Sequence, residues 1–575
     1  MQITGAELFV KSLQKENVDV LFAYPGGQAI DLFNALYGQD GIEMILPRHE
    51  QALVHAADGY ARSTGKVGVC LVTSGPGATN LVTGIATANY DSVPLVCFTG
   101  QVPTSLIGND AFQEVDTVGI TRSITKYTVT VRDREDLAMT IKKAFYIARS
   151  GKPGVVVVDL PKDIQQAYGS DYYPDTIEIR SYKPNTSVHS RQVKKAIDIL
   201  HDAKRPVFLI GGGVNIARAG AEMTKLAEKT GIPVVTTIMG KGALPTDHEL
   251  YIGNLGIHGS YAANSAISNC DVLLSIGTRF NDRITGKVGE FAKNAKIIHV
   301  DIDPASISRN IVVDVPIVAD AKNAINALLE KAEKLPIEDW MKQINEWKQS
   351  YPLVMKNTHM TPQIIIQKIN ETFKEAVITT DVGQNQLWAT QFLELNGSKQ
   401  MLTSGGLGTM GYGFPAALGA KIGNPEKDVI VITGDGGMQM NIQEMATAVV
   451  YELPVIICIM NNGYLGNVRQ WQEMFFNKRY SSTCMRHRKS CPSPCSTPGN
   501  NCPEYTPDFV RLAESYGAKG IRVEKVEDIV PALLSAKKNS KSPTVIEFII
   551  EREENVLPIV PPGSPLSDMI MESKE

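Results

Sequence analysis

Apolar and β-branched residues occur along this chain in short continuous runs rather than in strict alternation. Runs of this kind predict strands that are buried on both faces of a parallel sheet. They cover residues 67–73, 94–99, 154–160, 207–210, 234–237, 272–276, 297–300, 429–433 and 454–460. Helical patterns separate them, and this alternation indicates α/β domains built as doubly wound parallel sheets.

The length of the chain indicates several domains. Its 575 residues exceed one hydrophobic core, because domains average ~100–200 residues. The patterns predict α/β domains at 1–165, 190–335 and 361–550, followed by a C-terminal tail at 551–575. Between the first two domains, a stretch rich in Tyr, Ser, Asp and Pro predicts a linker, and the charged segment 332–360 predicts a helical connector.

Composition and charge narrow the classes of partner. The net charge of −4 and the pI near 6.2 provide no electrostatic footprint for nucleic acid or an anionic membrane. No apolar run approaches the ~20 residues that a membrane span needs, and the start lacks a basic, apolar leader. We therefore expect a cytoplasmic protein whose partners are small molecules and other subunits.

Two polar motifs follow strand-like runs in the third predicted domain. Gly434-Asp435-Gly436 comes directly after 429–433, and Asn461-Asn462 comes after 454–460. Both would lie at the carboxyl ends of parallel strands, where open α/β sheets bind ligands. A carboxylate and an amide oxygen suit Mg²⁺, and glycines let backbone N–H groups approach phosphate. Together the motifs predict a site for a metal-bound diphosphate, whereas GDG alone would usually be a turn.

A further candidate is Glu50, which precedes a helix. The small and apolar positions Leu53, Ala56, Ala57 and Tyr60 follow helical spacing. By position alone, Glu50 is an acid in a first helical turn, where the helix dipole favours it. A catalytic role requires the additional motifs below.

These motifs and several others resemble the catalytic subunits of acetohydroxyacid synthase (acetolactate synthase), which are thiamine diphosphate (ThDP) enzymes. In the first domain the matching stretches are Tyr24-Pro25-Gly26-Gly27, Arg48-His49-Glu50-Gln51, Thr73-Ser74-Gly75-Pro76-Gly77, Gly100-Gln101-Val102-Pro103 and 110–114. Later stretches are 279–283, 299–304, 405–415, 462–466, 468–472, 554–556 and 560–563. The resemblance covers nearly the whole chain.

The resemblance implies a pyrimidine-binding first domain, a central domain and a diphosphate-binding third domain. The active site would lie between the first domain of one subunit and the third domain of another, in a homodimer or homotetramer. The implied reaction decarboxylates pyruvate and couples it to pyruvate or 2-oxobutyrate, giving 2-acetolactate or 2-aceto-2-hydroxybutyrate for branched-chain amino-acid biosynthesis. The alternative is another ThDP-dependent 2-oxo acid decarboxylase or lyase, and a separate regulatory small subunit is a further expected partner.

The resemblance also implies how the cofactor would be held. Glu50 would activate it, and Asp435 and Asn462 would bind Mg²⁺ together with the backbone carbonyl of Tyr464. Met410 would prop ThDP in its bent conformation, although methionine is also a common core residue. The other residues expected along the cofactor are Gly26, Gly27, Thr73, Gly383, Gln384, Gly408, Gly434, Gly436, Gly437, Leu465 and Gly466.

The implied substrate contacts come from all three domains. Gln101 would hydrogen-bond the reacting oxygen, and Phe112 and Trp471 would shape the acceptor pocket. Arg283 would pair with the acceptor carboxylate, because its fork donates two parallel hydrogen bonds; the alternative for Arg283 is a surface salt bridge. Lys126 is a weaker second cation.

The central domain has a glycine run, Gly211-Gly212-Gly213, after 207–210. It lacks the GxGxxG spacing, which disfavours a nicotinamide oxidoreductase. The resemblance instead implies a non-redox FAD, and a duplicated fold without FAD is the alternative. The expected FAD contacts are Gly211, Gly212, Gly213, Thr237, Leu255, Gly256, His258, Gly277, Arg279, Arg283, Asp301, Ile302 and Asp320, while Lys152, Asn281 and Asn385 differ from the family pattern.

Four cysteines, Cys484, Cys491, Cys495 and Cys502, lie in a segment rich in Pro, Ser and Gly that the family usually lacks. Their spacing fits neither the common zinc pattern nor the common iron–sulfur pattern. Zinc or Fe–S binding, disulfides and free thiols therefore stay open, with disulfides least expected in the cytosol. Our hypothesis is a redox- or metal-sensitive clasp near the active site.

Overall fold

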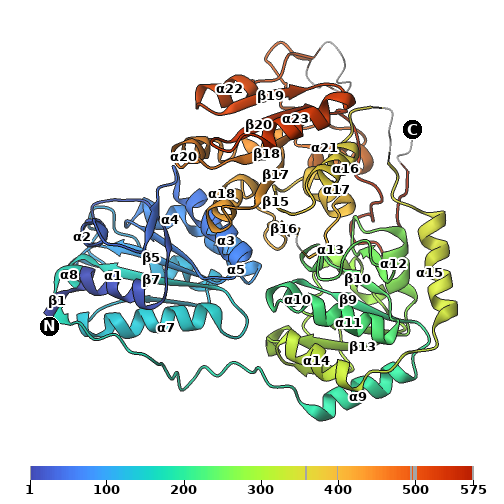
Figure 1. The fold of residues 1–575 in the computed structure, drawn as a ribbon, viewed down its shortest axis with the longest axis horizontal. Helices are drawn as coiled ribbons and strands as arrows, with labels where there is room; N and C mark the ends of the chain where they lie inside the picture. Colours follow the sequence, from blue (N-terminus) through green and yellow to red (C-terminus); the bar gives the residue numbers. More distant parts are fainter. Residues whose placement is uncertain (1, 356–358, 398, 493–494, 496–501, 573–575) are drawn as a thin grey trace.

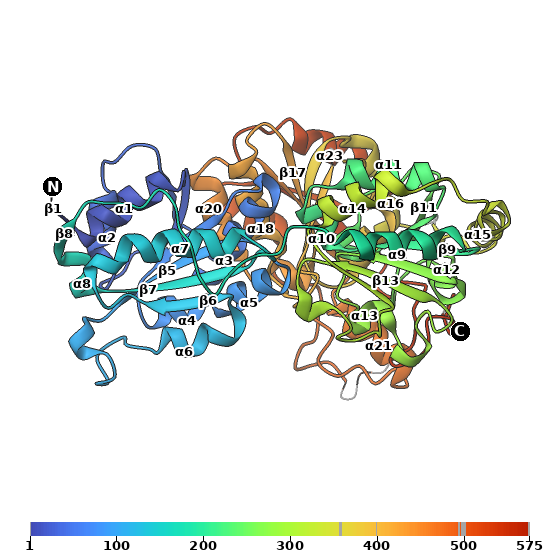
Figure 2. The ribbon, with the colours of Figure 1, turned by 90° about the horizontal axis from the view of Figure 1, so that it is seen from below.

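The computed structural model describes residues 2–355, 359–397, 399–492, 495 and 502–572. The elements form three α/β units (Figures 1 and 2). In Figure 1 the first unit lies at the left, the central unit at the lower right, and the third unit above them. A long extended connection along the lower side joins the first unit to the central unit. This connection covers the predicted linker.

The first sheet has six parallel strands in the order β3-β2-β4-β5-β7-β6. The strands are β2 Val20–Ala23, β3 Glu43–Ile45, β4 Gly68–Val72, β5 Leu95–Gln101, β6 Tyr127–Thr130 and β7 Val155–Pro161. The helices are α1 Gly5–Lys15, α2 Ile30–Leu36, α3 Glu50–Thr64, α4 Pro76–Asn80, α5 Val82–Tyr90, α6 Thr117–Thr121, α7 Leu137–Arg149 and α8 Lys162–Gln166. A short antiparallel pair joins β1 Gln2–Thr4 to β8 Tyr168–Ser170.

The central sheet is also parallel and has the order β11-β10-β9-β12-β13-β14. Its strands are β9 Pro206–Ile210, β10 Val234–Thr236, β11 Tyr251–Asn254, β12 Val272–Ile276, β13 Lys296–Asp301 and β14 Val315–Val318. Its helices are α9 Ser190–His201, α10 Gly212–Ile216, α11 Gly220–Thr230, α12 Tyr261–Asn269, α13 Asp282–Thr285 and α14 Ala321–Lys331. The following helix, α15 Glu338–Ser350, confirms the predicted helical connector.

The third sheet is parallel with the order β16-β15-β17-β18-β20-β19. Its strands are β15 Ala376–Thr380, β16 Gln400–Leu402, β17 Asp428–Gly434, β18 Val455–Asn461, β19 Lys519–Val523 and β20 Thr544–Ile549. Its helices are α16 Pro362–Thr372, α17 Gln384–Phe392, α18 Gly413–Gly423, α19 Asp435–Met438, α20 Met445–Val450, α21 Gly466–Phe475, α22 Phe509–Ser515 and α23 Ile529–Lys537.

The strand orders locate one crevice in each unit. Numbered within their own units, the strands of the first and third sheets both follow the order 2-1-3-4-6-5, and those of the central sheet follow 3-2-1-4-5-6. In each sheet the chain reverses its direction of travel beside the first strand. The crevices therefore lie between β2 and β4, between β9 and β12, and between β15 and β17, where open α/β sheets bind ligands.

The first and third units of one chain pack tightly through α3 and α18. A Cβ atom added at Gly59 would lie 2.0 Å from the carbonyl oxygen of Ala416, and one at Gly419 would lie 1.7 Å from that of Ala56. Only glycine permits backbones to approach this closely. The two helices therefore fix the first unit against the third.

The predicted fold class is confirmed: all nine apolar runs fall on buried parallel strands, such as β7 and β18, which are buried along their full length. The β1–β8 pair was not predicted, because three-residue strands leave little pattern. Among the described residues, no helix is both long enough and apolar enough to cross a membrane.

Candidate active site

A small cavity lies at the carboxyl ends of β15, β17 and β18. Its volume is about 40 Å³, which accommodates an ion or water but not a whole organic cofactor. It is lined by Val382, Gly383, Gln384, Asn385, Trp388, Gly434, Asp435, Gly436, Met460, Asn462, Tyr464 and Gly466. Most of the predicted diphosphate and metal residues therefore meet here, and all lining residues come from the third unit.

The strand register explains why the two motifs meet. β17 and β18 are hydrogen-bonded neighbours, with Gly434 paired to Met460. Asp435 lies one residue beyond Gly434 and Asn462 two residues beyond Met460, so both follow their strands at the same edge of the sheet. The crevice between β15 and β17 opens at this edge.

Asp435 is buried and incompletely paired. Burial raises the pKa of its carboxyl to about 7, while hydrogen bonds from Tyr505 and nearby backbone N–H groups lower it. Its Oδ2 atom is buried without a hydrogen-bond partner among the described residues. A buried carboxylate oxygen without a partner costs free energy unless a proton or cation joins it. This observation fits the predicted role of Asp435 as a ligand of Mg²⁺.

Asn462 is oriented by its neighbours. Its Nδ2 donates to Gln384 Oε1 at 3.3 Å, and its Oδ1 accepts from the backbone N–H of Tyr464 at 3.0 Å. Gln384 Nε2 donates in turn to Gln470 Oε1 at 2.9 Å. An amide oxygen has two lone pairs, so Asn462 Oδ1 keeps one for a cation beside Asp435.

Met410 lies against the Asp435 turn. A Cβ atom added at Gly436 would lie 3.5 Å from Met410 Cε and 2.9 Å from Leu465 Cδ2. Gly408 has a φ of 72° and open space around it. The structure thus places Met410 against the Asp435 turn, with Gly408 two residues before it in the chain.

Asp381, which we did not predict, anchors the backbone just after Met410. Its buried carboxylate accepts backbone N–H groups from Val382 at 2.8 Å, Gly411 at 3.0 Å and Gly413 at 3.1 Å. Burial raises its pKa to about 6. Gly437 packs on the same carboxylate. A sequence signal existed, since Asp381 follows β15 as Asp435 opens α19 after β17.

The first unit places Glu50 away from this cavity. Glu50 is half-buried in the first turn of α3, and its Oε2 accepts from Asn80 Nδ2 at 2.9 Å. The preceding Arg48 donates its backbone N–H to Glu444 Oε1 at 2.9 Å, on the third unit. Glu50 therefore does not line the cavity that Asp435 of the same chain forms.

Other predicted residues of the first unit gather in its own crevice. Gly26 is in close contact with Thr73, because an added Cβ would lie 2.5 Å from the Thr73 side chain. Thr73 Oγ1 also accepts the backbone N–H of Gln28 at 3.3 Å. Gly27 has open space around its Cα. The structure groups Gly26, Gly27 and Thr73 with one another but not with Asp435.

Gln101, at the end of β5, is turned into the first unit. Its Nε2 donates to Val115 O at 3.0 Å and to Asp159 Oδ2 at 3.1 Å, and its Oε1 accepts the backbone N–H of Val102. Only 2% of Gln101 is exposed. All its polar atoms are occupied in this structure, so contact with a substrate would require the side chain to turn.

The three predicted acceptor residues come from three different units of the chain. Phe112 is 85% exposed. Arg283, on α13, is largely exposed and lies 3.6 Å from Asp282, which matches the surface salt-bridge alternative. Trp471, on α21, packs edge-on against Phe475, with ring centroids 6.1 Å apart. The indole N–H of Trp471 is buried without a partner among the described residues.

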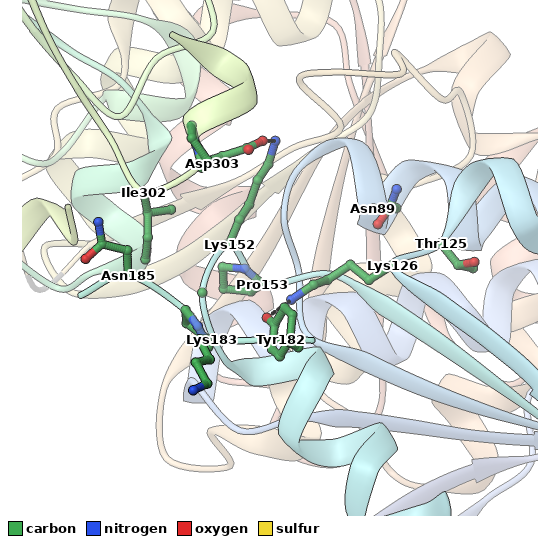
Figure 3. Close-up of a pocket in the computed structure, with 13 residues that line it drawn as sticks. Asn89, Thr125, Lys126, Lys152, Pro153, Tyr182, Lys183, Asn185, Ile302 and Asp303 are labelled. Atoms are coloured by element: carbon green, nitrogen blue, oxygen red, sulfur yellow. Dashed lines mark hydrogen bonds and ion pairs between the residues drawn. The ribbon is translucent and has the colours of Figure 1, made fainter. Parts of the chain in front are cut away.

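Lys126 lies in a different cavity, between the first unit, the linker and the central unit (Figure 3). Its Nζ donates to Ser150 O at 2.8 Å and to Tyr182 Oη at 3.0 Å. Burial lowers its pKa to about 8. These contacts make Lys126 a support for the linker in this structure, not a second cation beside Arg283.

The same cavity has a volume of about 410 Å³ and reaches the central sheet. Lys152 and Asp303 form an ion pair of 3.3 Å across it, and Ile302 lies at its rim (Figure 3). Ile302 follows β13 directly. The cavity therefore opens onto the carboxyl edge of the central sheet.

The residues predicted for FAD gather along that edge. Each lies on or just beyond the end of β9, β10, β11, β12, β13 or β14. Gly213 donates its backbone N–H to Gly277 O at 3.1 Å, across the crevice between β9 and β12. A Cβ atom at Gly211 would lie 2.2 Å from Gly277 O, so close backbone packing is one reason for glycine at this position.

The remaining members of the FAD set have internal partners. Thr237 caps a short 3₁₀ helix by accepting from Gly240 N, and Asp320 caps α14 by accepting from Asn323 N. Asn264 Oδ1 accepts the backbone N–H of Gly256, and burial lowers the pKa of His258 to about 4. Burial raises the pKa of the Asp301 carboxyl to about 6. Leu255 donates its backbone N–H to Thr236 O, and Gly212 packs near Met239. The Arg279 guanidinium lies 5.8 Å from the centre of the Tyr90 ring.

The cysteine segment provides no metal centre. Among the described residues, which include all four cysteines, no three His, Cys, Asp or Glu side chains are grouped to hold a metal ion. The backbone of Cys484 pairs with Tyr464, and Cys491 Sγ accepts from Arg488 N at 3.3 Å. In the described part of the chain, Cys484, Cys491, Cys495 and Cys502 therefore do not come together as the ligands of a zinc or Fe–S site.

A buried charge network joins the first unit to the Met410 loop. Arg62, on α3, lies 2.7 Å from Asp58 and 3.0 Å from Asp91, and donates to Thr403 O at 2.9 Å. Asp91 accepts the backbone N–H groups of Gly405 and Gly406 at 3.0 and 2.8 Å. The loop that carries Met410 is thus fixed by the first unit of its own chain.

Comparison with known proteins agrees with this architecture. Three domain families match in chain order: thiamine pyrophosphate enzyme, N-terminal TPP binding domain, at residues 3–120; its central domain at 193–328; and its C-terminal TPP binding domain at 381–548. The last match covers the Asp435 and Asn462 cavity.

Full-length relatives narrow the family. The chain is 46% identical to the probable acetolactate synthase large subunit of Methanocaldococcus jannaschii, over 98% of this chain and 95% of that protein. It is 45% identical to the acetolactate synthase large subunit of Corynebacterium glutamicum, over 99% and 90%. It is 42% identical to the acetolactate synthase isozyme 3 large subunit of Escherichia coli, over 100% and 99%. The chain therefore belongs to the acetolactate synthase large subunits of the ThDP enzyme family.

Proposed function

We propose that this chain decarboxylates pyruvate and joins the remaining two-carbon unit to a second 2-oxo acid. With pyruvate as acceptor the product is 2-acetolactate, and with 2-oxobutyrate it is 2-aceto-2-hydroxybutyrate. One CO₂ leaves in each turnover. These products serve branched-chain amino-acid biosynthesis.

The observation that carries this proposal is the pairing of Asp435 and Asn462 around a small cavity at neighbouring strand ends. Asp435 Oδ2 is buried without a partner among the described residues, which suits Mg²⁺. Asp435, Asn462 and the Tyr464 carbonyl would hold the ion, and Met410 would support the cofactor. When bound, ThDP supplies a carbon centre that accepts the electrons released by decarboxylation.

Glu50 would hold and exchange a proton at N1′ of the cofactor's pyrimidine ring. Because Glu50 does not line the cavity of its own chain, we propose that it serves the site of a second copy. The functional unit would then be at least a homodimer, and a homotetramer would preserve the same pairing. The relatives named as large subunits support a separate regulatory small subunit as a further partner.

We also propose that the central unit binds FAD without redox turnover. The strand order 3-2-1-4-5-6 is the dinucleotide-binding order, with the ligand at the reversal point. Gly211 and Gly277 face each other at that point. The cavity of about 410 Å³ supplies space at the end of β13, the strand that pairs with β12.

The test is to incubate the purified protein with pyruvate, ThDP and Mg²⁺ and to measure CO₂, acetolactate and acetaldehyde. We expect acetolactate as the main product and a dependence on both ThDP and Mg²⁺. Acetaldehyde as the main product would support the alternative, a simple 2-oxo acid decarboxylase. Heat-released flavin absorbance in the same preparation tests FAD, and its absence would refute that part alone.

A further inference from the structure

The side-chain amide of Gln470, on α21, is hydrogen-bonded to the backbone of the C-terminal tail. Its Nε2 donates to Val556 O at 2.9 Å, and its Oε1 accepts the backbone N–H of Val556 at 2.9 Å. Gln470 and Val556 are both fully buried. Because a backbone N–H can only donate and a carbonyl can only accept, these two bonds permit one orientation of the Gln470 amide.

The residue before Gln470 binds the same stretch of the tail. Arg469 Nη2 donates to Glu554 O at 3.2 Å and to Asn555 Oδ1 at 2.6 Å. Arg469 is also fully buried. Three consecutive tail residues, 554–556, are therefore held against α21 by buried hydrogen bonds.

The orientation of Gln470 sets that of Gln384, the first residue of α17. Gln384 Nε2 donates to Gln470 Oε1 at 2.9 Å and to Glu554 O at 3.1 Å. Both partner atoms can only accept, so the amide nitrogen of Gln384 faces α21 and the tail. The other atom of the same amide, Gln384 Oε1, accepts from Asn462 Nδ2 at 3.3 Å.

Asn462 is the last amide of this series. Its nitrogen is bound to Gln384, and its Oδ1 accepts the backbone N–H of Tyr464. A reversed Asn462 amide would present an N–H donor where a cation needs an oxygen ligand. The hydrogen bond to Gln384 therefore favours the one orientation of Asn462 that can bind Mg²⁺.

We propose that Gln470 is a positioning residue for the metal site: through Gln384 it keeps the oxygen of Asn462 available to Mg²⁺. Gln470 does not line the cavity that Asp435 and Asn462 form, so it acts through Gln384 alone. Partners that orient metal ligands in this way typically contribute 10–100-fold to metal affinity. This role rests on the proposed function, in which Asn462 is a metal ligand.

The experiment compares Gln470→Met with the full-length parent protein, because methionine has about the length of glutamine but no amide. The matched control is Gln391→Met. Gln391, on α17, also donates to the tail backbone, at Leu557 O, and its other bond is to His258 O, both at 3.1 Å. Mg²⁺ is titrated at saturating ThDP by isothermal titration calorimetry. The titration is made below the melting temperature of each variant, which is measured without Mg²⁺ and ThDP.

We expect Gln470→Met to weaken Mg²⁺ binding by about 10- to 100-fold, and Gln391→Met to bind Mg²⁺ as the parent does. A smaller loss in Gln470→Met would overturn the proposal, and so would an equal loss in Gln391→Met. If Gln470→Met does not fold, Gln384→Met tests the next amide of the series, and parental Mg²⁺ binding in that variant would also overturn the proposal.

A conservative variant separates the orientation of the amides from the packing of the tail. Gln470→Glu keeps an oxygen that accepts from Gln384 and from the backbone N–H of Val556, so it should bind Mg²⁺ more tightly than Gln470→Met. Equal losses in these two variants would count against the proposal. Parental Mg²⁺ binding in Asp435→Asn would refute the metal site itself, whereas a loss in Asp435→Asn without one in Gln470→Met would refute only the role of Gln470.

Discussion

The first and third units have the same strand order, but the residues at the carboxyl ends of their strands are arranged differently. In the third unit the carboxyl edge of the sheet encloses a cavity beside Asn462, where Asp435 Oδ2 has no hydrogen-bond partner among the described residues. In the first unit, Gly26 is in close contact with Thr73, and Gln101 is bound to Asp159. Phe112 is exposed nearby on the loop after β5.

The metal site that we propose is completed by the folding of one chain, whereas the proposed role of Glu50 requires a second chain. The proposed metal ligands, Asp435 and Asn462, follow adjacent strands of one sheet, so pairing of β17 with β18 brings them together. Glu50 is held by α3, which packs on α18 of the same chain and is fixed by Arg62. This placement supports the proposal that Glu50 serves the site of a second copy.

The largest expected effect is that of Glu50→Gln. It should lower kcat by about 10²–10⁴-fold, because proton transfer by a positioned side chain contributes that much. The fold should be retained, since Glu50 is half-buried and makes one side-chain hydrogen bond, to Asn80. Turnover of pyruvate and the circular dichroism spectrum provide the two measurements.

A mixing experiment tests whether the Glu50 and Asp435 of one active site come from different chains. Glu50→Gln and Asp435→Asn are each expected to be nearly inactive. If the two residues come from different chains, mixed dimers contain one site with both native residues, and part of the activity returns. If they act within one chain, every site in the mixture carries one substitution, and activity stays absent. Recovery on mixing is the result we expect.

Sequence reasoning located the parts of the site that depend on neighbouring strands. Asp435 and Asn462 follow continuous apolar runs, and such runs fix both the strands and the edge at which they end. It did not locate Asp91, because its role depends on which segments meet across long separations in the chain. Asp91 meets Gly405 only after the first and third units have docked.

The orientation of Gln101 was beyond prediction for a related reason. The motif Gly100-Gln101-Val102-Pro103 indicates where Gln101 lies along the chain, at the end of β5. Its side-chain direction is decided by Asp159 on β7, which accepts its amide. A pattern along one strand contains no information about such a partner on the next.

Arg62→Met tests whether the first unit is rigidly docked on the third. Removing Arg62 leaves Asp58 and Asp91 buried near each other without their cation. We expect a loss of about 3–5 kcal/mol in the free energy of unfolding, measured by chemical denaturation. Arg149→Met is the control, because Arg149 is half-exposed in its ion pair with Glu16 and should cost less than about 1 kcal/mol. Equal, small losses would mean that Glu50 is free to reach its own chain's cavity.

Asp159→Asn tests, through the pH dependence of stability, whether Asp159 is a buried acid at the carboxyl edge of the first sheet. Burial raises the pKa of Asp159 to about 6, above the ordinary value of about 3.9. The folded state then binds more protons than the unfolded state between these values, so stability falls as pH rises from about 4 to about 6. The substitution should remove about 2 kcal/mol of this pH-dependent decrease in the free energy of unfolding, measured by denaturation at several pH values.

The matched control for that pH series is Asp175→Asn, since Asp175 is exposed in the linker. It should leave the pH dependence of the parent unchanged. Parallel curves for Asp159→Asn and the parent would show that Asp159 is not held as a buried acid. Gln101 would then be free for a substrate, and the contrast between the two edges would weaken.

Phe112→Ala should have the smallest effect on stability. Because Phe112 is 85% exposed, its truncation should change the free energy of unfolding by no more than about 0.5 kcal/mol. If a second copy covers it as part of the acceptor pocket, the ratio of 2-aceto-2-hydroxybutyrate to 2-acetolactate should change by up to about tenfold. The assay supplies equal pyruvate and 2-oxobutyrate. Tyr37→Ala, at an equally exposed aromatic of the first unit, should leave the ratio unchanged, and a parental ratio in Phe112→Ala would remove Phe112 from the pocket.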